Sequence, residues 1–167
     1  MKKGLINIYY GEGKGKSTAS LGRALVSASE GKEVFIIQFL KGRLSGKLNY
    51  LQRLEPEIKV FRFEKIEKYY ENLSEEEKKE ENNNILNGVH FAKKVLNIGE
   101  CDLLILDEIL GLVDLGIIDV QEVRRLLDAK PDDMELILTG RNLPEELKDV
   151  ADYISCIGII KDSENGL

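Results

Sequence analysis

The sequence has no tryptophan, a single histidine and two cysteines. Cys101 and Cys156 lie far apart and form no Cys-x-x-Cys pair, which argues against a zinc site and a disulfide framework. Both flank apolar runs, so we expect reduced, buried thiols. No apolar run approaches the roughly 20 residues that a membrane-spanning helix needs, and the start of the chain lacks the pattern of a signal peptide. We therefore expect a cytoplasmic protein with no membrane partner.

Positive charge is also scarce: 24 lysine and arginine residues stand against 30 aspartate and glutamate residues, for a net charge of −6 at pH 7. This total argues against nucleic acid as a partner, although it leaves room for a local cationic pocket that binds a small anion. The composition, 43% hydrophobic and 32% charged, is that of a soluble globular protein. The length of 167 residues favours a single domain, residues 1–167, over two.

Short apolar runs alternate along the chain with longer segments of helical periodicity. The runs at 34–37 (Val-Phe-Ile-Ile) and 103–106 (Leu-Leu-Ile-Leu) contain no polar residues, which is typical of strands covered on both faces. The pattern predicts an α/β fold with a mostly parallel central sheet and helices on both faces. The predicted strands are residues 5–10, 33–40, 58–63, 102–106, 134–138 and 153–160.

Three helix starts are predicted from the spacing of a polar cap and a carboxylate. The pairs are Ser74 and Glu77, Asp119 and Glu122, and Asn142 and Glu145. In each pair the cap can accept a backbone N–H while the carboxylate returns to the N–H of the cap. We expect a helix to begin at all three places.

The segment 61–84 is rich in charge and closes with three consecutive asparagines. One interpretation is a solvated helix face with a loop insertion. The alternative is a charged lid over a ligand site, with Tyr69 and Tyr70 as its apolar contacts. The sequence leaves both open.

The strongest functional signal is a glycine-rich loop between the first predicted strand and the first predicted helix. Its glycines allow backbone angles that a Cβ atom forbids, so consecutive N–H groups can point at phosphate oxygens. The helix directs its partial positive charge to the same place. Lys16 adds a full charge, and the Ser17 hydroxyl can bind Mg²⁺. Tyr10 stands where the general pattern has a glycine. The loop consists of Gly11, Glu12, Gly13, Lys14, Gly15, Lys16 and Ser17.

A second element is expected to act together with this loop. It is an apolar run that ends in Asp107 and Glu108. The carboxyl ends of parallel strands face the ligand crevice, where a carboxylate can hold Mg²⁺ directly or through water. Because successive strand residues face opposite sides of a sheet, the two carboxylates are expected to do different work. Together with the loop, the pair indicates a site for ATP and magnesium.

The detailed form of several segments resembles one family, the ATP:corrinoid adenosyltransferases that make adenosylcobalamin. The resemblance runs in order from Gly4 to about Lys161. It rests on the loop form Gly-x-Gly-Lys-Gly-Lys-Ser-Thr, Gln-Phe-Leu-Lys-Gly at 38–42, Leu-Asp-Glu-Ile at 106–109, Leu-Thr-Gly-Arg at 138–141, Pro-Glu-Glu-Leu at 144–147 and Ala-Asp at 151–152.

The resemblance implies a RecA-like P-loop fold, a homodimer, and transfer of the 5′-deoxyadenosyl group of ATP to the Co(I) of a reduced corrinoid, with triphosphate released. The implied enzyme is a cob(I)yrinic acid a,c-diamide or cob(I)alamin adenosyltransferase, with Mg²⁺ as cofactor and an electron-donating reductase as partner. Because Co(I) is itself nucleophilic, positioning and charge neutralisation suffice, and no Ser, Cys or His base is needed.

The resemblance also assigns residues. Lys16 and Glu108 are the implied catalytic residues, and Ser17 and Glu108 match the magnesium ligands. The residues expected at the nucleotide are Gly11, Glu12, Gly13, Lys14, Gly15, Lys16, Ser17, Thr18, Gln38, Lys41 and Arg141.

One departure from the family keeps other functions open. The family's Gly-Phe-Thr-Trp stretch, whose aromatic residues lie against the corrinoid, has no recognisable counterpart. Aromatic residues between Phe61 and Tyr70 are expected to replace it. The alternative is an ATP-binding or ATP-hydrolysing relative without corrinoid chemistry that acts as a regulator or assembly partner. Small-molecule kinase activity suits the loop alone.

Overall fold

A six-stranded sheet forms the centre of the computed structural model, which describes residues 3–41 and 51–164. All of the strand pairings are parallel in these two ranges, and the strand order is β3-β2-β4-β5-β1-β6. The predicted parallel α/β sheet is confirmed. The strands are β1 (Ile6–Tyr10), β2 (Val34–Gln38), β3 (Ile58–Arg62), β4 (Leu103–Asp107), β5 (Glu135–Gly140) and β6 (Tyr153–Cys156).

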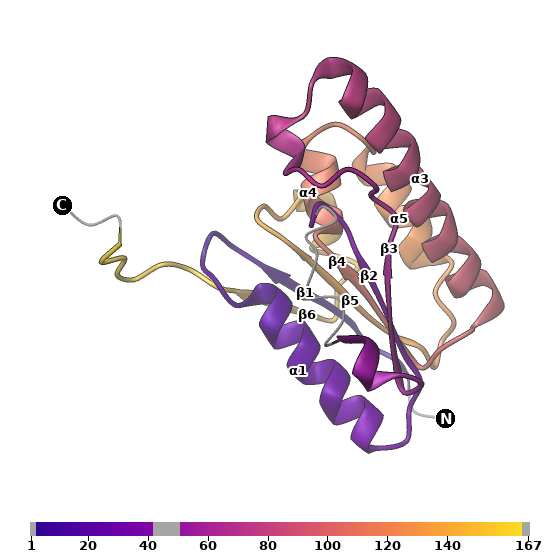
Figure 1. Ribbon diagram of the computed structural model, residues 1–167. Helices are drawn as coiled ribbons and strands as arrows, with labels where there is room; N and C mark the ends of the chain where they lie inside the picture. Colours follow the sequence, from indigo (N-terminus) through magenta and orange to yellow (C-terminus); the bar gives the residue numbers. More distant parts are fainter. Residues whose placement is uncertain (1–2, 42–50, 165–167) are drawn as a thin grey trace.

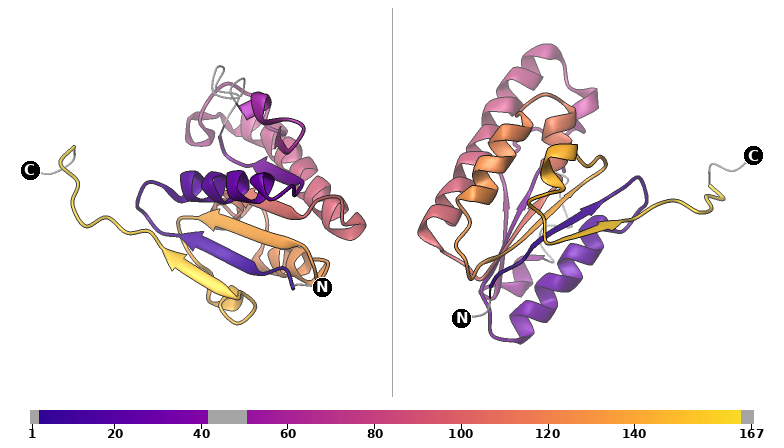
Figure 2. Two further views of the ribbon diagram at one scale, coloured as in Figure 1. Left: turned by 90° about the horizontal axis from the view of Figure 1, so that it is seen from below. Right: turned by 180° about the vertical axis from the view of Figure 1, so that it is seen from behind.

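Helices cover both faces of the sheet (Figure 1). α1 (Lys16–Ser29) and the 3-10 turn η1 (Gln52–Leu54) lie on one face, and α3 (Glu75–Ile98), α4 (Ile109–Asp114) and α5 (Val120–Asp128) lie on the other, as the views in Figure 2 show. Two further 3-10 turns are η2 (Tyr70–Asn72) and η3 (Glu145–Leu147). Within the described ranges, none of the helices has the length and apolar character to cross a membrane.

Side-chain alternation places a row of polar groups at the carboxyl edge of the sheet. Ile105 belongs to the core cluster under α1, and Leu106 belongs to the larger cluster under α3, α4 and α5. The side chain of the next residue, Asp107, therefore returns to the α1 side. By register Asp107 lies beside Gln38 of β2, which in turn lies beside Arg62 of β3. The sheet thus brings together polar residues that are far apart in sequence.

The charged segment 61–84 comprises the end of β3, a loop, η2 and the first part of α3. Its three asparagines lie inside α3 rather than in a loop. The buried carboxylate of Glu81 accepts hydrogen bonds from the backbone N–H groups of Lys65 and Ile66, at 2.9 and 2.8 Å. These bonds tie the loop to the helix. Closure of this segment over a ligand stays a prediction.

Of the three predicted helix caps, two are confirmed and one is wrong. At Asp119 the carboxylate accepts the Glu122 N–H at 2.8 Å, at the start of α5. At Ser74 the hydroxyl accepts the Glu77 N–H at 3.2 Å and the Glu77 carboxylate accepts the Ser74 N–H at 2.8 Å, so α3 begins with a complete capping box. Asn142 caps no helix, and its side-chain amide donates to the Asp114 carboxylate at 3.0 Å. Only the three-residue turn η3 follows it.

The last strand corrects two expectations. β6 ends at Cys156 rather than near residue 160, and it lies at the edge of the sheet, where β1 is its one neighbour among the described strands. Its residues are exposed, so the Cys156 thiol is exposed and not buried as expected. Cys101 is buried, and burial raises the pKa of its thiol to about 12.

Candidate functional site

The phosphate loop joins β1 to α1, and glycine determines its shape. Gly11 and Gly15 have φ angles of +125° and +113°, a region that residues with a Cβ atom rarely adopt. A Cβ atom on Gly13 would lie 2.8 Å from the carbonyl oxygen of Ile157. The Gly13 N–H donates to this same oxygen at 2.8 Å. The loop is therefore braced by the segment that leaves β6, and the alternate glycines make that close packing feasible.

The start of α1 concentrates positive potential at this loop. Gly15 is the N-cap, no side chain caps the helix, and its first turn has no acidic residue. The first N–H groups of a helix have no acceptor within the helix and attract anions. The Lys16 ammonium folds back over the loop and donates to the carbonyl oxygen of Gly13 at 2.9 Å. The loop is thus a candidate anion site in a chain whose net charge is negative.

Asp107, at the end of β4, connects the phosphate loop to the neighbouring strands. Its side chain is only 1% exposed. Its Oδ1 accepts hydrogen bonds from the hydroxyls of Ser17, at 2.8 Å, and Thr139, at 2.6 Å. Its Oδ2 lies 3.6 Å from the ammonium of Lys41, which also donates to the Ser17 hydroxyl at 3.1 Å. Side chains from α1, β5 and the turn after β2 therefore converge on one buried carboxylate.

Glu108 occupies a different place from Asp107, as strand alternation predicts. Its φ is +65°, in the left-handed region, and its N–H donates to the Thr139 hydroxyl at 2.8 Å. Burial raises the pKa of the Glu108 carboxyl, and the positive charges of Lys41 and Lys16 act in the opposite direction. The charges of Lys41 and Lys16 thus act on Glu108 without a direct contact among the described residues, whereas Asp107 makes the direct contact with the phosphate loop.

The donor set fits a magnesium ion held mainly by phosphates and water. Within the two described ranges, no group of three His, Cys, Asp or Glu residues could enclose a metal, but magnesium on a nucleotide needs only one or two protein ligands. Asp107 Oδ2 is buried and has no hydrogen-bond partner, and the Ser17 hydroxyl lies on the same carboxylate. Ser17 and Asp107 therefore fit the ion. Asp107 was absent from the predicted ligands, Ser17 and Glu108, although strand alternation was a signal for it.

A further cation, Arg62, lies in the same row and was not predicted. Its Nε donates to the side-chain oxygen of Gln38 at 2.7 Å. Burial lowers the pKa of Arg62, while the negative charges of Glu64 and Asp107 raise it. Its proximity to the site depends on β3 lying next to β2, which the sequence does not reveal.

The other residues predicted at the nucleotide lie around the rim of this site. Glu12, Lys14 and Thr18 are exposed on the loop and the first turn of α1. The Lys14 ammonium forms an exposed ion pair, at 3.2 Å, with a carboxylate of the C-terminal segment. Arg141 is also exposed, and its carbonyl oxygen accepts the Gly11 N–H at 3.0 Å. Gly42, in the Gln-Phe-Leu-Lys-Gly segment, lies outside the described residues.

The aromatic residues offered as corrinoid contacts are largely engaged in internal packing. The ring of Phe61 lies 5.2 Å from that of Phe35 and 4.8 Å from that of Phe91, between centroids. Phe63 lies 5.5 Å from Phe91. Tyr69, in contrast, is 52% exposed. An aromatic contact with a ligand at this surface is therefore most readily made by Tyr69.

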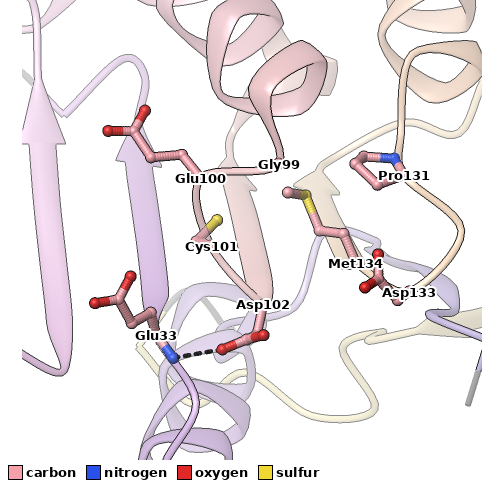
Figure 3. Close-up of a pocket in the computed structure, with 8 residues that line it drawn as sticks. All are labelled: Glu33, Gly99, Glu100, Cys101, Asp102, Pro131, Asp133 and Met134. Atoms are coloured by element: carbon pink, nitrogen blue, oxygen red, sulfur yellow. Dashed lines mark hydrogen bonds between the residues drawn. The ribbon is translucent and has the colours of Figure 1, made fainter. Parts of the chain in front are cut away.

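A pocket at the opposite edge of the sheet does not suit a nucleotide (Figure 3). It is lined by four carboxylates and by Gly99, Cys101, Pro131 and Met134, with no lysine or arginine among them. The Asp102 carboxylate accepts the Glu33 N–H at 2.8 Å. Like charges repel, so this pocket disfavours phosphate, and the carboxyl edge is the better anion site.

Comparisons with known proteins point to one family. The family model described as ATP:corrinoid adenosyltransferase BtuR/CobO/CobP matches residues 2–166. A corrinoid adenosyltransferase of Escherichia coli K12 is 28% identical over 161 residues, which covers 96% of this chain and 79% of that protein. The corrinoid adenosyltransferase CobA of Salmonella typhimurium is 29% identical with the same coverage.

Two other matches are a longer relative and a solved structure with a similar fold. An uncharacterised Nostoc protein is 35% identical over 91% of this chain, which spans only 43% of that relative. A KaiC-like protein of Pyrococcus horikoshii has a TM-score of 0.58 at 16% identity, covering 98% of this chain and 75% of that structure. This likeness concerns the fold alone, and it confirms the expected RecA-like architecture. With a family match that extends over both the phosphate loop and the Asp107 cluster, the chain belongs to the ATP:corrinoid adenosyltransferase family.

Proposed function

We propose that this protein transfers the 5′-deoxyadenosyl group of ATP to the Co(I) of a reduced corrinoid and releases triphosphate. The family match over residues 2–166 carries the proposal. It is supported by a phosphate site in which the loop, Lys41 and Asp107 are in direct contact. The relatives named corrinoid adenosyltransferase in Escherichia coli and Salmonella point the same way.

The reaction balances without a protein nucleophile. The electron pair of Co(I) attacks C5′ of ATP, a Co–C bond forms, and the C5′–O bond breaks with its electron pair leaving on triphosphate. The cobalt of the substrate is oxidised by two electrons, and no proton moves. The protein has to hold C5′ in line with the cobalt and stabilise the charge that collects on triphosphate.

The residues of the site suit that task. In our proposal the loop N–H groups and Lys16 bind the triphosphate oxygens, and Lys41 neutralises further charge from the β2 side. Ser17 and Asp107 would hold Mg²⁺, with Glu108 as the second carboxylate of the site. Bound there, Mg²⁺ supplies charge neutralisation for the leaving triphosphate.

Product analysis tests the proposal. We expect ATP, Mg²⁺ and a chemically reduced corrinoid to give adenosylcorrinoid and triphosphate in equal amounts. Lys16→Ala should abolish both products, whereas the matched control Lys93→Ala, on the exposed face of α3, should leave them unchanged. Release of ADP and phosphate, with no adenosylcorrinoid, would contradict adenosyl transfer.

One observation favours the alternative, an ATP-binding or ATP-hydrolysing relative that acts as a regulator or assembly partner. Phe61 and Phe63 pack against Phe91, so they are engaged away from a corrinoid. This alternative expects ATP binding without corrinoid-dependent turnover, and the same assay distinguishes the two functions.

The family resemblance also leads us to propose a homodimer, a cytoplasmic location and an electron-donating reductase. Light scattering on the purified chain tests the dimer, which requires twice the 18.9 kDa mass of one chain. A reductant-free assay, supplemented with candidate flavoprotein reductases, tests the electron donor.

A further inference from the structure

The turn after β2 has a strained backbone directly beside the phosphate site. Leu40 has a φ of +59°, and the other non-glycine residue with positive φ in the described ranges is Glu108. In this region the Cβ atom of an L-residue crowds its own backbone. Such a conformation persists where surrounding contacts hold it, and it is common at functional sites.

Contacts on three sides hold Leu40 in place. The preceding N–H, that of Phe39, donates to the carbonyl oxygen of Asp107 at 2.9 Å. The N–H of Leu40 itself donates to Oε1 of Glu64 at 2.7 Å. The Leu40 side chain lies against α4, where a Cβ atom on Gly111 would come within 2.8 Å of its Cδ1. The hydrogen bond to Glu64 is the contact that ties this turn to β3 and its loop.

The conformation of Leu40 sets the starting direction of Lys41. A lysine side chain is long and flexible, so its reach depends on where its backbone points. Here the Lys41 ammonium reaches the Ser17 hydroxyl at 3.1 Å and Asp107 Oδ2 at 3.6 Å. The turn therefore delivers a positive charge to the Ser17–Asp107 pair.

Burial of the Glu64 carboxylate at this position costs desolvation free energy. Glu64 is 8% exposed, and a buried carboxylate is costly unless its hydrogen bonds compensate. Its charged neighbours are Arg62 on β3 and Glu81 on α3, so one charge attracts it and the other repels it. The Glu64 carboxylate accepts the N–H of Leu40 in the turn and forms no salt bridge within residues 3–41 and 51–164.

We propose that Glu64 is a positioning residue for the nucleotide site: it holds the N–H of Leu40 and thereby sets Lys41 against Ser17 and Asp107. The proposal rests on the nucleotide-binding half of the proposed function and does not depend on corrinoid chemistry. Glu64 itself touches neither the phosphate loop nor Asp107 in the described contacts.

A double-mutant cycle on Mg-ATP affinity tests this coupling. Glu64→Ala should weaken binding roughly tenfold, the usual scale for loss of one hydrogen bond to a charged group. Lys41→Ala should weaken binding at least as much, and the double variant should be no weaker than Lys41→Ala alone, because both changes act through the same ammonium. Glu64→Gln keeps an acceptor for Leu40 and should bind within about threefold of the wild type.

Two controls separate positioning from general destabilisation. Glu67→Ala removes an exposed glutamate from the same loop and should leave affinity unchanged. Glu81→Gln weakens the anchor of that loop at Lys65 and Ile66, so it should lower the melting temperature while remaining additive with Lys41→Ala. Additive effects of Glu64→Ala and Lys41→Ala, or equal losses in Glu67→Ala, would overturn the proposal.

A measurement without nucleotide completes the test. In Glu64→Gln the amide proton of Leu40 should shift upfield in the NMR spectrum, because a neutral acceptor replaces a charged one, while the Lys41 side-chain signals should stay close to those of the wild type. An unchanged Leu40 amide signal would overturn the proposal even if Glu64→Ala does not fold. If the wild type shows no corrinoid turnover but Glu64 and Lys41 remain coupled in Mg-ATP binding, adenosyl transfer is refuted and the positioning role of Glu64 stands.

Discussion

Asp107→Asn is the sharpest test of the site, because it separates the carboxylate that the family resemblance assigns to magnesium, Glu108, from the one that touches Ser17. The amide is nearly isosteric, and its oxygen can still accept from Ser17 and Thr139, whose hydroxyls lie 2.8 and 2.6 Å from Oδ1. The change removes the negative charge and turns an N–H₂ donor toward the Lys41 ammonium, which lies 3.6 Å from Oδ2. The cation-binding side of the cluster is lost while its shape is kept.

The magnitude follows from the charged contacts. A hydrogen bond to a charged group contributes about 1.5–3 kcal/mol, and about 1.4 kcal/mol is a factor of ten in Kd. We therefore expect the Kd for Mg-ATP to rise about 10- to 100-fold in Asp107→Asn. Glu108→Gln should give a smaller increase, because no described contact joins Glu108 to Ser17.

Titration calorimetry with and without Mg²⁺ provides the assay. For metal-free ATP, Asp107→Asn should bind as tightly as the wild type or more tightly, since removing the carboxylate removes repulsion of the triphosphate. Two results would refute the reasoning: a Kd for Mg-ATP within twofold of the wild type, or the same loss with and without the metal. A larger loss in Glu108→Gln than in Asp107→Asn would return the metal to the residue that the family resemblance implies.

Three further predictions follow from the local environments. Lys16→Ala should weaken ATP binding in calorimetry about 100-fold, because it removes a charge seated on the loop, whereas Lys14→Ala should have a smaller effect, since the Lys14 side chain is 92% exposed in its ion pair; equal losses would contradict this. In the native protein iodoacetamide should modify the exposed Cys156 and spare Cys101, whose pKa is raised to about 12 by burial; mass spectrometry showing two modified thiols before unfolding would be inconsistent. Burial raises the folded-state pKa of Glu64 above its ordinary value of 4.5, so its stabilising contribution is complete below that value and is lost as pH rises through the raised pKa. Denaturant unfolding from pH 4 to pH 7 should therefore show Glu64→Gln gaining stability relative to the wild type, and a constant difference would be the contrary result.

Some features of the fold depend only on a few residues that are neighbours in the sequence. The glycines at 11 and 15 are required by positive φ angles, and the Ser74 capping box was visible in its spacing. Asn142 has the same spacing but caps nothing: its amide N–H₂ donates to Asp114, which lies next to it only in the folded chain, and only the three-residue turn η3 follows. Cap spacing is a local signal, and whether a helix follows it depends on packing of the whole chain.

The sequence by itself determined that this chain has a phosphate loop, a parallel sheet and two carboxylates after a buried strand. Only the tertiary structure decided which carboxylate meets Ser17, because that depends on the face to which Asp107 points. Strand order likewise decided that Arg62 and Glu64 of the β3 edge lie beside the turn of Leu40 and Lys41. Local periodicity reports which side chains share a face, whereas the neighbours across a sheet are set by packing of the whole chain.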